Sequence, residues 1–189
     1  ERDMPLDAVA TGASAFTVQR ATPAQNFDLT NVNMDTAPVG GAPAFWSSSN
    51  LSATATTDTR PLTTSQASNE LQSLSNTSTM SKSLPVAAGS FVAARAWVKP
   101  ITAPANSSLQ FTVSGSASGV TSVNVPLTAP STNNGWIQVI LPPHKVAALD
   151  GPIDVAFVFT GNGLTVRLDD IDIRPTSWWD RNTVTNLDF

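Results

Sequence analysis

The sequence has no cysteine, one histidine and two glutamates, and each shortage excludes a kind of site. Without cysteine there can be no disulfide framework, no thiolate metal site and no cysteine nucleophile. The single histidine, His144, excludes a metal site built from several histidines. A glycosidase needs two paired carboxylates, and neither Glu1 nor Glu70 lies in a recognisable motif. The sequence therefore predicts a protein without catalytic activity of its own.

Charge and long apolar segments are also scarce. Only 13% of the residues are charged, and the formal net charge is −4. An acidic chain lacks the basic patch that nucleic-acid binding requires. No apolar run approaches the roughly 18 residues that a membrane-spanning helix needs. We therefore expect neither a nucleic acid nor a membrane as a partner.

Hydroxyl residues and turn formers are abundant instead. The chain contains 21 serines, 23 threonines and 14 prolines, whereas glutamate and lysine, which favour helices, number two and three. This balance of residue propensities favours strands and turns over helices. Together with the absence of cysteine, it predicts an all-β protein that is exposed outside a cell or on a virion surface.

Apolar residues alternate with polar ones in five segments, at 90–99, 109–114, 123–127, 136–141 and 153–160. Alternation with a period of two is typical of strands that bury one face. Glycine, proline and asparagine separate the segments at the spacing found in sandwiches. The fold class that this pattern predicts is an antiparallel β-sandwich of jelly-roll type. In the weaker stretch before residue 84, Ser68 to Leu71 could instead open one turn of helix, with Ser68 as its cap.

The alternation shifts by one residue near the end of the domain. Val166 and Leu168 are apolar at even positions, whereas Ile171 and Ile173 are apolar at odd positions. A one-residue shift of this kind predicts a β-bulge at Asp169–Asp170. The bulge would turn one aspartate inward, where its carboxylate needs a partner.

The chain divides into three parts. Residues 1–24 form an N-terminal arm, 25–175 the sandwich and 176–189 a C-terminal tail. Three aromatic residues are candidates for contact with other protein subunits: Phe16 in the arm, and Trp178 and Trp179 in the tail. Large aromatic side chains that the domain itself leaves exposed usually mark a surface that a partner covers. We therefore expect the protein to form a homo-oligomer or to bind capsid or tail proteins.

Four short segments together resemble one family of domains. They are Gln25-Asn26-Phe27-Asp28, the strand from Leu84 to Lys99, Gly135-Trp136, and Leu168-Asp169-Asp170-Ile171. In this combination the chain resembles the jelly-roll carbohydrate-binding modules of families 4, 9 and 22. Domains of similar appearance also occur in bacteriophage surface and decoration proteins. The resemblance covers about residues 25–174 and implies the sandwich fold.

The resemblance also implies a structural cation. In such modules an acidic residue near the first strand and an aspartate of the closing strand hold Ca²⁺, and the matching residues here are Asp28 and Asp170. Calcium takes six to eight oxygen ligands, some of them backbone carbonyls. The alternative is an ordinary bulge with solvated aspartates and no required cofactor.

A glycan platform is the second candidate site. If Val92, Ala94, Ala96 and Val98 face the core, then Arg95 and Trp97 share the opposite face. By the same parity Gln110, Thr112 and Gln138 would join them. An indole beside amide, hydroxyl and guanidinium groups suits a sugar. The alternative is that Trp97 packs under the arm or a neighbouring subunit.

Two functions from different classes fit these features. The first is a non-catalytic structural β-sandwich of an extracellular assembly, such as a bacteriophage head decoration or fibre protein, which can also bind glycans weakly. The second is a carbohydrate-binding module of a polysaccharide-degrading enzyme. The low charge and the two extensions favour the first function, and the family resemblance favours the second.

Overall fold

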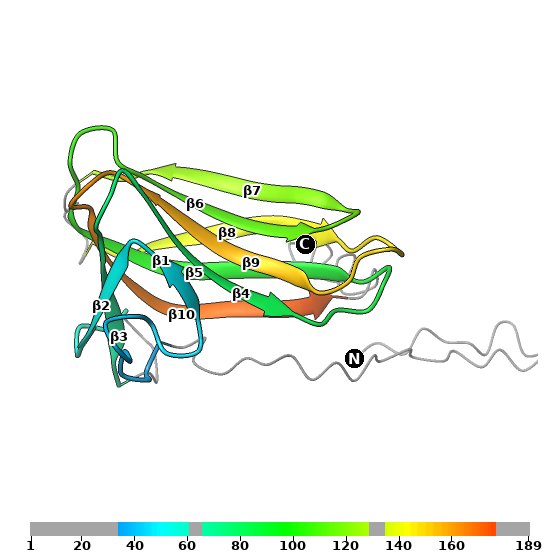
Figure 1. Ribbon diagram of the computed structural model, residues 1–189, viewed down its shortest axis with the longest axis horizontal. Helices are drawn as coiled ribbons and strands as arrows, with labels where there is room; N and C mark the ends of the chain where they lie inside the picture. Colours follow the sequence, from blue (N-terminus) through cyan, green and yellow to red (C-terminus); the bar gives the residue numbers. More distant parts are fainter. Residues whose placement is uncertain (1–33, 61–65, 129–134, 177–189) are drawn as a thin grey trace, which may run out of the picture.

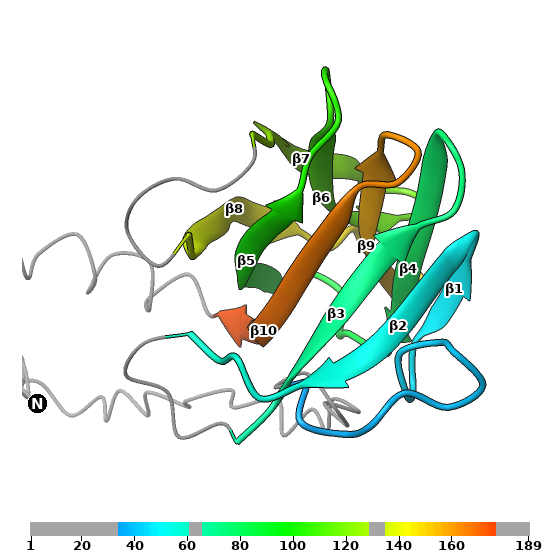
Figure 2. The same ribbon diagram turned by 90° about the vertical axis from the view of Figure 1, so that its left-hand side faces the viewer.

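The computed structural model describes residues 34–60, 66–128 and 135–176, and its regular elements are ten β-strands. They form two antiparallel sheets of five strands, stacked face to face (Figures 1 and 2). Sheet I has the order β1 (Ser47–Ser49), β4 (Thr77–Leu84), β9 (Ile153–Thr160), β6 (Ser108–Gly115) and β7 (Gly119–Pro126). Sheet II has the order β2 (Leu51–Thr56), β3 (Ser68–Ser73), β10 (Thr165–Thr176), β5 (Phe91–Thr102) and β8 (Ile137–Lys145). The predicted all-β sandwich is confirmed.

The core lies between the sheets and is built from the alternate residues of each strand. The side chains expected to face inward on β5 are buried, as are their counterparts on β6 and β9. Phe111 and Phe157 stack with ring centroids 4.3 Å apart, and Trp46 meets Phe157 edge-on at 6.1 Å. Fully burying a side chain of this size contributes about 1.5–3 kcal/mol. No helix in the described part of the chain is long and apolar enough to cross a membrane.

The predicted bulge occurs in β10, where the pairing with β5 shifts between Asp169 and Asp172. Asp170 takes a left-handed φ of 43° and supplies the extra residue that re-phases the strand. Val166 and Leu168 before the bulge, like Ile171 and Ile173 after it, are buried in the core. The bulge therefore allows both apolar pairs of β10 to face the same core.

The sequence predicts an aspartate that faces the core, but the buried aspartate, Asp169, lies on the outer side of sheet II. Asp169 is fully buried, yet it pairs with Trp97 of β5, whose side chain lies on the outer face of sheet II. Residues directly opposite each other on paired strands point to the same side. Asp169 is buried because the segment after β2 covers it, and the Arg60 N–H donates to its Oδ2 at 2.9 Å.

One smaller expectation is also corrected, and the expected arm and tail stay a prediction. Ser68 to Leu71 belong to β3, which lies between β2 and β10, and not to a turn of helix. Pairing with two neighbouring strands outweighs the local preference for a helix start. Of the predicted tail only Thr176 is described, as the last residue of β10, and the arm 1–24 lies outside the described residues.

Candidate functional site

The outer face of sheet II carries the polar side chains that the fold brings together. Strand pairing sets Gln138 beside Trp97 and Trp97 beside Asp169, across β8, β5 and β10. In the next row Ile140 lies beside Arg95, and Arg95 beside Asp172. Three of the predicted glycan-binding residues, Arg95, Trp97 and Gln138, therefore share one surface.

Trp97 is half-buried on this surface because Arg60 covers part of it. The guanidinium carbon of Arg60 lies 5.3 Å from the centre of the Trp97 ring, within the range of a cation–π contact. Arg60 is anchored over β10, where its backbone N–H binds Asp169 and its Nε pairs with Asp170. The indole is thus held by a cation from the β10 side, with Gln138 of β8 on its other side.

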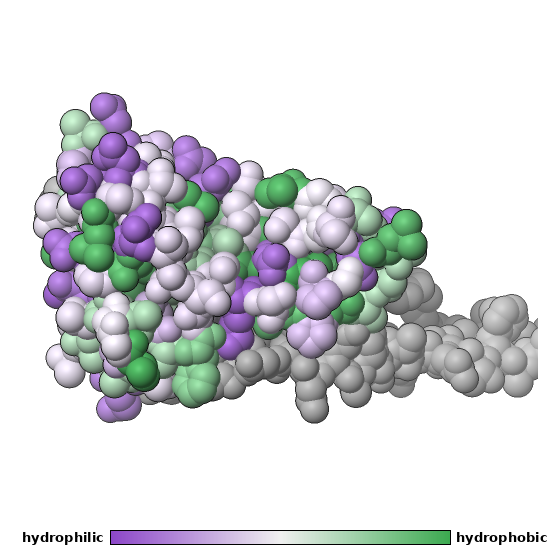
Figure 3. All heavy atoms as spheres, viewed as in Figure 1, coloured by the Kyte–Doolittle hydropathy of each residue, from purple (hydrophilic) through white to green (hydrophobic). Residues whose placement is uncertain are grey.

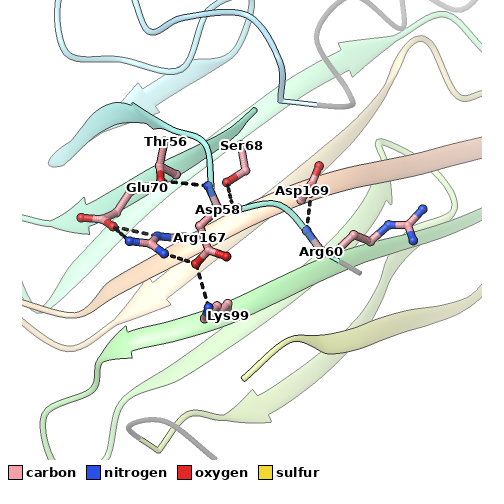
Figure 4. Close-up of polar contacts among 8 residues, drawn as sticks. All are labelled: Thr56, Asp58, Arg60, Ser68, Glu70, Lys99, Arg167 and Asp169. Atoms are coloured by element: carbon pink, nitrogen blue, oxygen red, sulfur yellow. Dashed lines mark hydrogen bonds and ion pairs between the residues drawn. The ribbon is translucent and has the colours of Figure 1, made fainter. Parts of the chain in front are cut away.

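A network of ion pairs occupies the neighbouring part of the face, over β3, β10 and β5 (Figure 4). Asp58 accepts from Lys99 Nζ at 2.7 Å and pairs with Arg167, which also binds Glu70 at 2.9 Å. Partial burial acts to raise the pKa of Asp58, but the hydrogen bonds from Lys99 and Arg167 outweigh it and lower the pKa. Asp58 is therefore ionised at neutral pH, and each charge in this network has an opposite partner.

The open end of the face holds a different arrangement, in which two arginines share one carboxylate. Arg95 donates from Nε and Nη2 to Asp172 Oδ2, and Arg174 donates from Nε to Asp172 Oδ1. The side chains of Arg95 and Arg174 are 50% and 69% exposed. Hydrogen bonding to Asp172 raises the pKa of Arg174 above its ordinary value. Among the described residues, this end of the face therefore carries one positive charge more than its carboxylate balances.

Gln110 and Thr112 do not join this surface. Both lie on β6, between β9 and the edge strand β7 of sheet I, with Asn124 and Ser122 of β7 as neighbours. They face outward on the opposite side of the sandwich. Parity along a strand determines which way a side chain points relative to its own sheet, but not which sheet the strand joins.

The outer face of sheet I differs sharply from that of sheet II. Its outward strand positions carry hydroxyl, amide and small aliphatic side chains, and among them only Asp154 is charged. Much of this face is pale in the space-filling view (Figure 3), the colour of residues of intermediate hydropathy. Of the two outer faces, the charged side chains of the described residues are thus concentrated on that of sheet II.

The predicted calcium ligands are not both visible. Asp28 lies outside the described residues, and Asp170 forms an ion pair with Arg60. Among the residues that the structure describes, no group of three or more His, Cys, Asp or Glu could hold a metal ion. The calcium site stays a prediction, as do the partner contacts of Phe16, Trp178 and Trp179, which also lie outside the described residues.

A second polar cluster, which sequence analysis did not detect, surrounds His144. This residue lies at the end of β8, with Nε2 2.7 Å from Ser118 Oγ and Nδ1 2.9 Å from Thr121 Oγ1. Burial lowers the pKa of His144, against the opposing charge of Asp150, so its imidazole is neutral at pH 7. The three residues come from different turns and strands, so no sequence spacing reveals them.

Asp150 completes this cluster as a structural clamp. Its carboxylate accepts the backbone N–H groups of Ala117, Ser118 and Ala147 at 2.6–3.1 Å. A hydrogen bond from the Ser118 side chain has the largest effect on the pKa of Asp150. Together with these backbone hydrogen bonds it lowers that pKa far below its ordinary value. A catalytic triad needs the aspartate on histidine Nδ1, whereas here Nδ1 bonds Thr121. The cluster therefore ties the β6–β7 hairpin to the loop after β8, and its geometry is not that of a Ser-His-Asp triad.

Comparison with known proteins gives matches to solved structures. No family model and no curated protein matches this sequence. A family 61 carbohydrate-binding module, solved with β-1,4-galactotriose, superposes with a TM-score of 0.57 at 15% identity over 78% of this chain and 97% of that one. The C-terminal family 22 module of Clostridium thermocellum Xyn10B gives 0.51 at 8% identity, over 72% and 88% of the two chains.

A part of bacteriophage CBA120 tailspike protein 4, solved as its enzymatically active domain, matches with a TM-score of 0.53 at 9% identity. It covers 70% of this chain and 20% of that one. All these identities are low, so the matches establish a shared fold. The chain has the jelly-roll-like fold of carbohydrate-binding modules, as its motifs predicted, and the same fold occurs within a phage tailspike.

Proposed function

We propose that this protein is a non-catalytic β-sandwich of an extracellular assembly that binds a glycan on the outer face of sheet II. The observation that carries the proposal is the grouping of Trp97, Arg95 and Gln138 on adjacent strands of one exposed face. The indole offers an apolar surface to a sugar ring, and the amide and guanidinium offer hydrogen bonds to its hydroxyls. The solved family 61 module with bound galactotriose supports the choice of ligand class, through the shared fold alone.

Substitution of the platform tests this proposal. Trp97→Ala should lower the affinity for any retained polysaccharide by about tenfold or more, which corresponds to roughly 1.4 kcal/mol or more. Gln138→Ala should weaken binding by a smaller factor, because it removes one hydrogen-bonding side chain. The measurement is affinity electrophoresis against a panel of soluble polysaccharides, with circular dichroism as the check on folding.

The chain provides a matched control in Gln110, which lies on the opposite face of the sandwich. Gln110→Ala removes the same chemical group as Gln138→Ala and should leave retention unchanged. If Gln110→Ala and Gln138→Ala weaken binding equally, or if Trp97→Ala binds like the parent, the platform is not on sheet II. Unfolding of Trp97→Ala would instead assign the indole a packing role.

The structural role within the assembly, which is the other half of this proposal, concerns the opposite face. The outer face of sheet I favours it, because a face with almost no charge can be covered by a partner without the cost of desolvating ions. Its serines, threonines and small aliphatic residues also lose little side-chain entropy when they are covered. The likeness to part of a phage tailspike supports this role through the fold alone. Native mass measured over a range of concentrations tests it.

A further inference from the structure

Two arginines at the open end of the glycan face are held in place by a single carboxylate. Arg95 on β5 and Arg174 on β10 both bind Asp172, at 2.7–3.0 Å. These bonds use Nε of both arginines and one hydrogen of Arg95 Nη2. The sharing of Asp172 also brings the two guanidinium groups close together. The trio carries one positive charge in excess.

Within the part of the chain that the structure describes, the outward edges of both guanidinium groups remain available to a ligand. Neither Arg95 nor Arg174 makes a further hydrogen bond within the described residues, and half or more of each side chain is exposed. The other guanidinium groups of this face differ, because Arg167 is bound by Asp58 and Glu70, and Arg60 pairs with Asp170 and lies over Trp97. Of the two lysines, Lys99 pairs with Asp58, and Lys145 offers an ammonium group without a planar fork. Among the described residues, Arg95 and Arg174 are therefore the two guanidinium groups that share one carboxylate, in the two rows that follow the row of Trp97.

The free donors have the geometry that a carboxylate requires. A guanidinium presents two parallel N–H groups along its Nη1–Nη2 edge, which match the two oxygens of a planar carboxylate. Asp172 holds both planes from the sheet side, so less conformational freedom is lost when a ligand binds. Ile140, 62% exposed and paired with Arg95, adds an apolar surface for the sugar ring.

Resting on the proposed glycan-binding function, we infer that the ligand is an acidic polysaccharide whose uronate carboxylates bind the free edges of Arg95 and Arg174. A sugar ring of the same polysaccharide packs beside Trp97 and Ile140. The attraction is local, because the whole protein carries a net charge of −4 and repels a polyanion at long range. Recognition of the carboxylate therefore depends on these two side chains and not on net charge.

The experiment compares acidic polymers with their esterified forms, which keep the same backbone and lose the charge. The probes are polygalacturonate beside methyl-esterified polygalacturonate, and alginate beside its propylene glycol ester, in affinity electrophoresis with the full chain. We expect at least one acidic polymer to bind about tenfold more tightly than its ester. This preference should fall as the salt concentration rises.

Variants of the pair separate guanidinium geometry from charge. Arg95→Gln with Arg174→Gln should bind the acidic polymer no better than its ester. Arg95→Lys, which keeps the charge and loses the fork, should lose most of the preference. Lys145→Gln is the charge control, because it removes one exposed positive charge from the same face, opposite Phe91 at the end of β8, and leaves both arginines intact. It should change the affinity by less than about twofold.

The outcomes distinguish this inference from the function on which it rests. If the acidic polymer and its ester bind equally, or if only a neutral galactan retains the protein, the inference of an acidic ligand is wrong. The proposed glycan binding then still holds. An equal loss in Lys145→Gln and in the arginine variants shows attraction by charge alone and also overturns the inference. If the parent retains no polysaccharide of either kind, both the inference and the proposed function fail.

Discussion

Gly115, the last residue of β6, shows how closely single residues are fitted around the His144 cluster. A Cβ placed on Gly115 would lie 2.4 Å from Ser118 Oγ and 2.5 Å from the carboxyl carbon of Asp150. Both atoms belong to the clamp that ties the β6–β7 hairpin to the loop after β8. Only a hydrogen fits at this position, so the clamp requires glycine for space and not for its backbone freedom.

Gly115→Ala should therefore destabilise the fold by about 1–3 kcal/mol, the usual cost of overpacking a closely packed site. Gly151→Ala is the matched control, since a Cβ there meets nothing within 4 Å. Urea denaturation of both variants measures the difference. A Gly115→Ala protein as stable as Gly151→Ala would show that the clamp can move aside without loss.

Strand β10 shows what one extra residue does to a whole element. Before the bulge its even residues face the core, and after Asp170 its odd residues do. The period of two made this shift visible in the sequence, because no other arrangement keeps both isoleucines and both earlier apolar residues on one side. The same bulge sets Asp169 and Asp170 side by side on the outer face, where Arg60 binds both.

Deletion of Asp170 should turn Ile171 and Ile173 out to solvent. Loss of two buried isoleucines costs about 3–6 kcal/mol, which is a large part of the stability of an ordinary domain. We expect the deletion variant to be insoluble or to melt far below the parent. Asp170→Gly serves as the control, because glycine accepts the positive φ and the lost ion pair is worth about 1 kcal/mol or less. A deletion variant with the parent's melting temperature would show that β10 can re-register.

At the scale of the whole molecule, the two outer faces of the sandwich have different chemistry. Sheet II carries ion pairs, an indole and exposed guanidinium groups, whereas sheet I carries hydroxyl groups and almost no charge. One face is suited to recognise a polar ligand, and the other can be covered by a neighbour at little cost. The two proposed functions therefore concern separate surfaces of one protein.

A charge introduced on the outer face of sheet I tests the two surfaces independently. If sheet I is the assembly interface, Thr112→Lys should reduce the oligomer seen by native mass spectrometry, because it buries an unpaired charge in the contact. Polysaccharide retention through sheet II should not change. A parent that is monomeric at every concentration, or an oligomer that tolerates Thr112→Lys, contradicts an assembly role for this face.

The sequence by itself determined the fold class, the inward residues of the main strands and the position of the bulge. Each of these follows from local alternation, since neighbouring side chains of a strand must point to opposite sides. The grouping of Arg95 with Trp97 follows from the same rule, because both lie on β5.

Only the tertiary structure decided which strands share a sheet, and therefore which of the predicted residues meet. It separated Gln110 and Thr112 from Trp97, and it brought Arg60, in the segment after β2, to the indole that it partly covers. It also paired Arg95 and Arg174 around Asp172, although the two arginines lie on different strands. These contacts depend on the register between strands that are distant in the chain, and a period of two carries no information about that register.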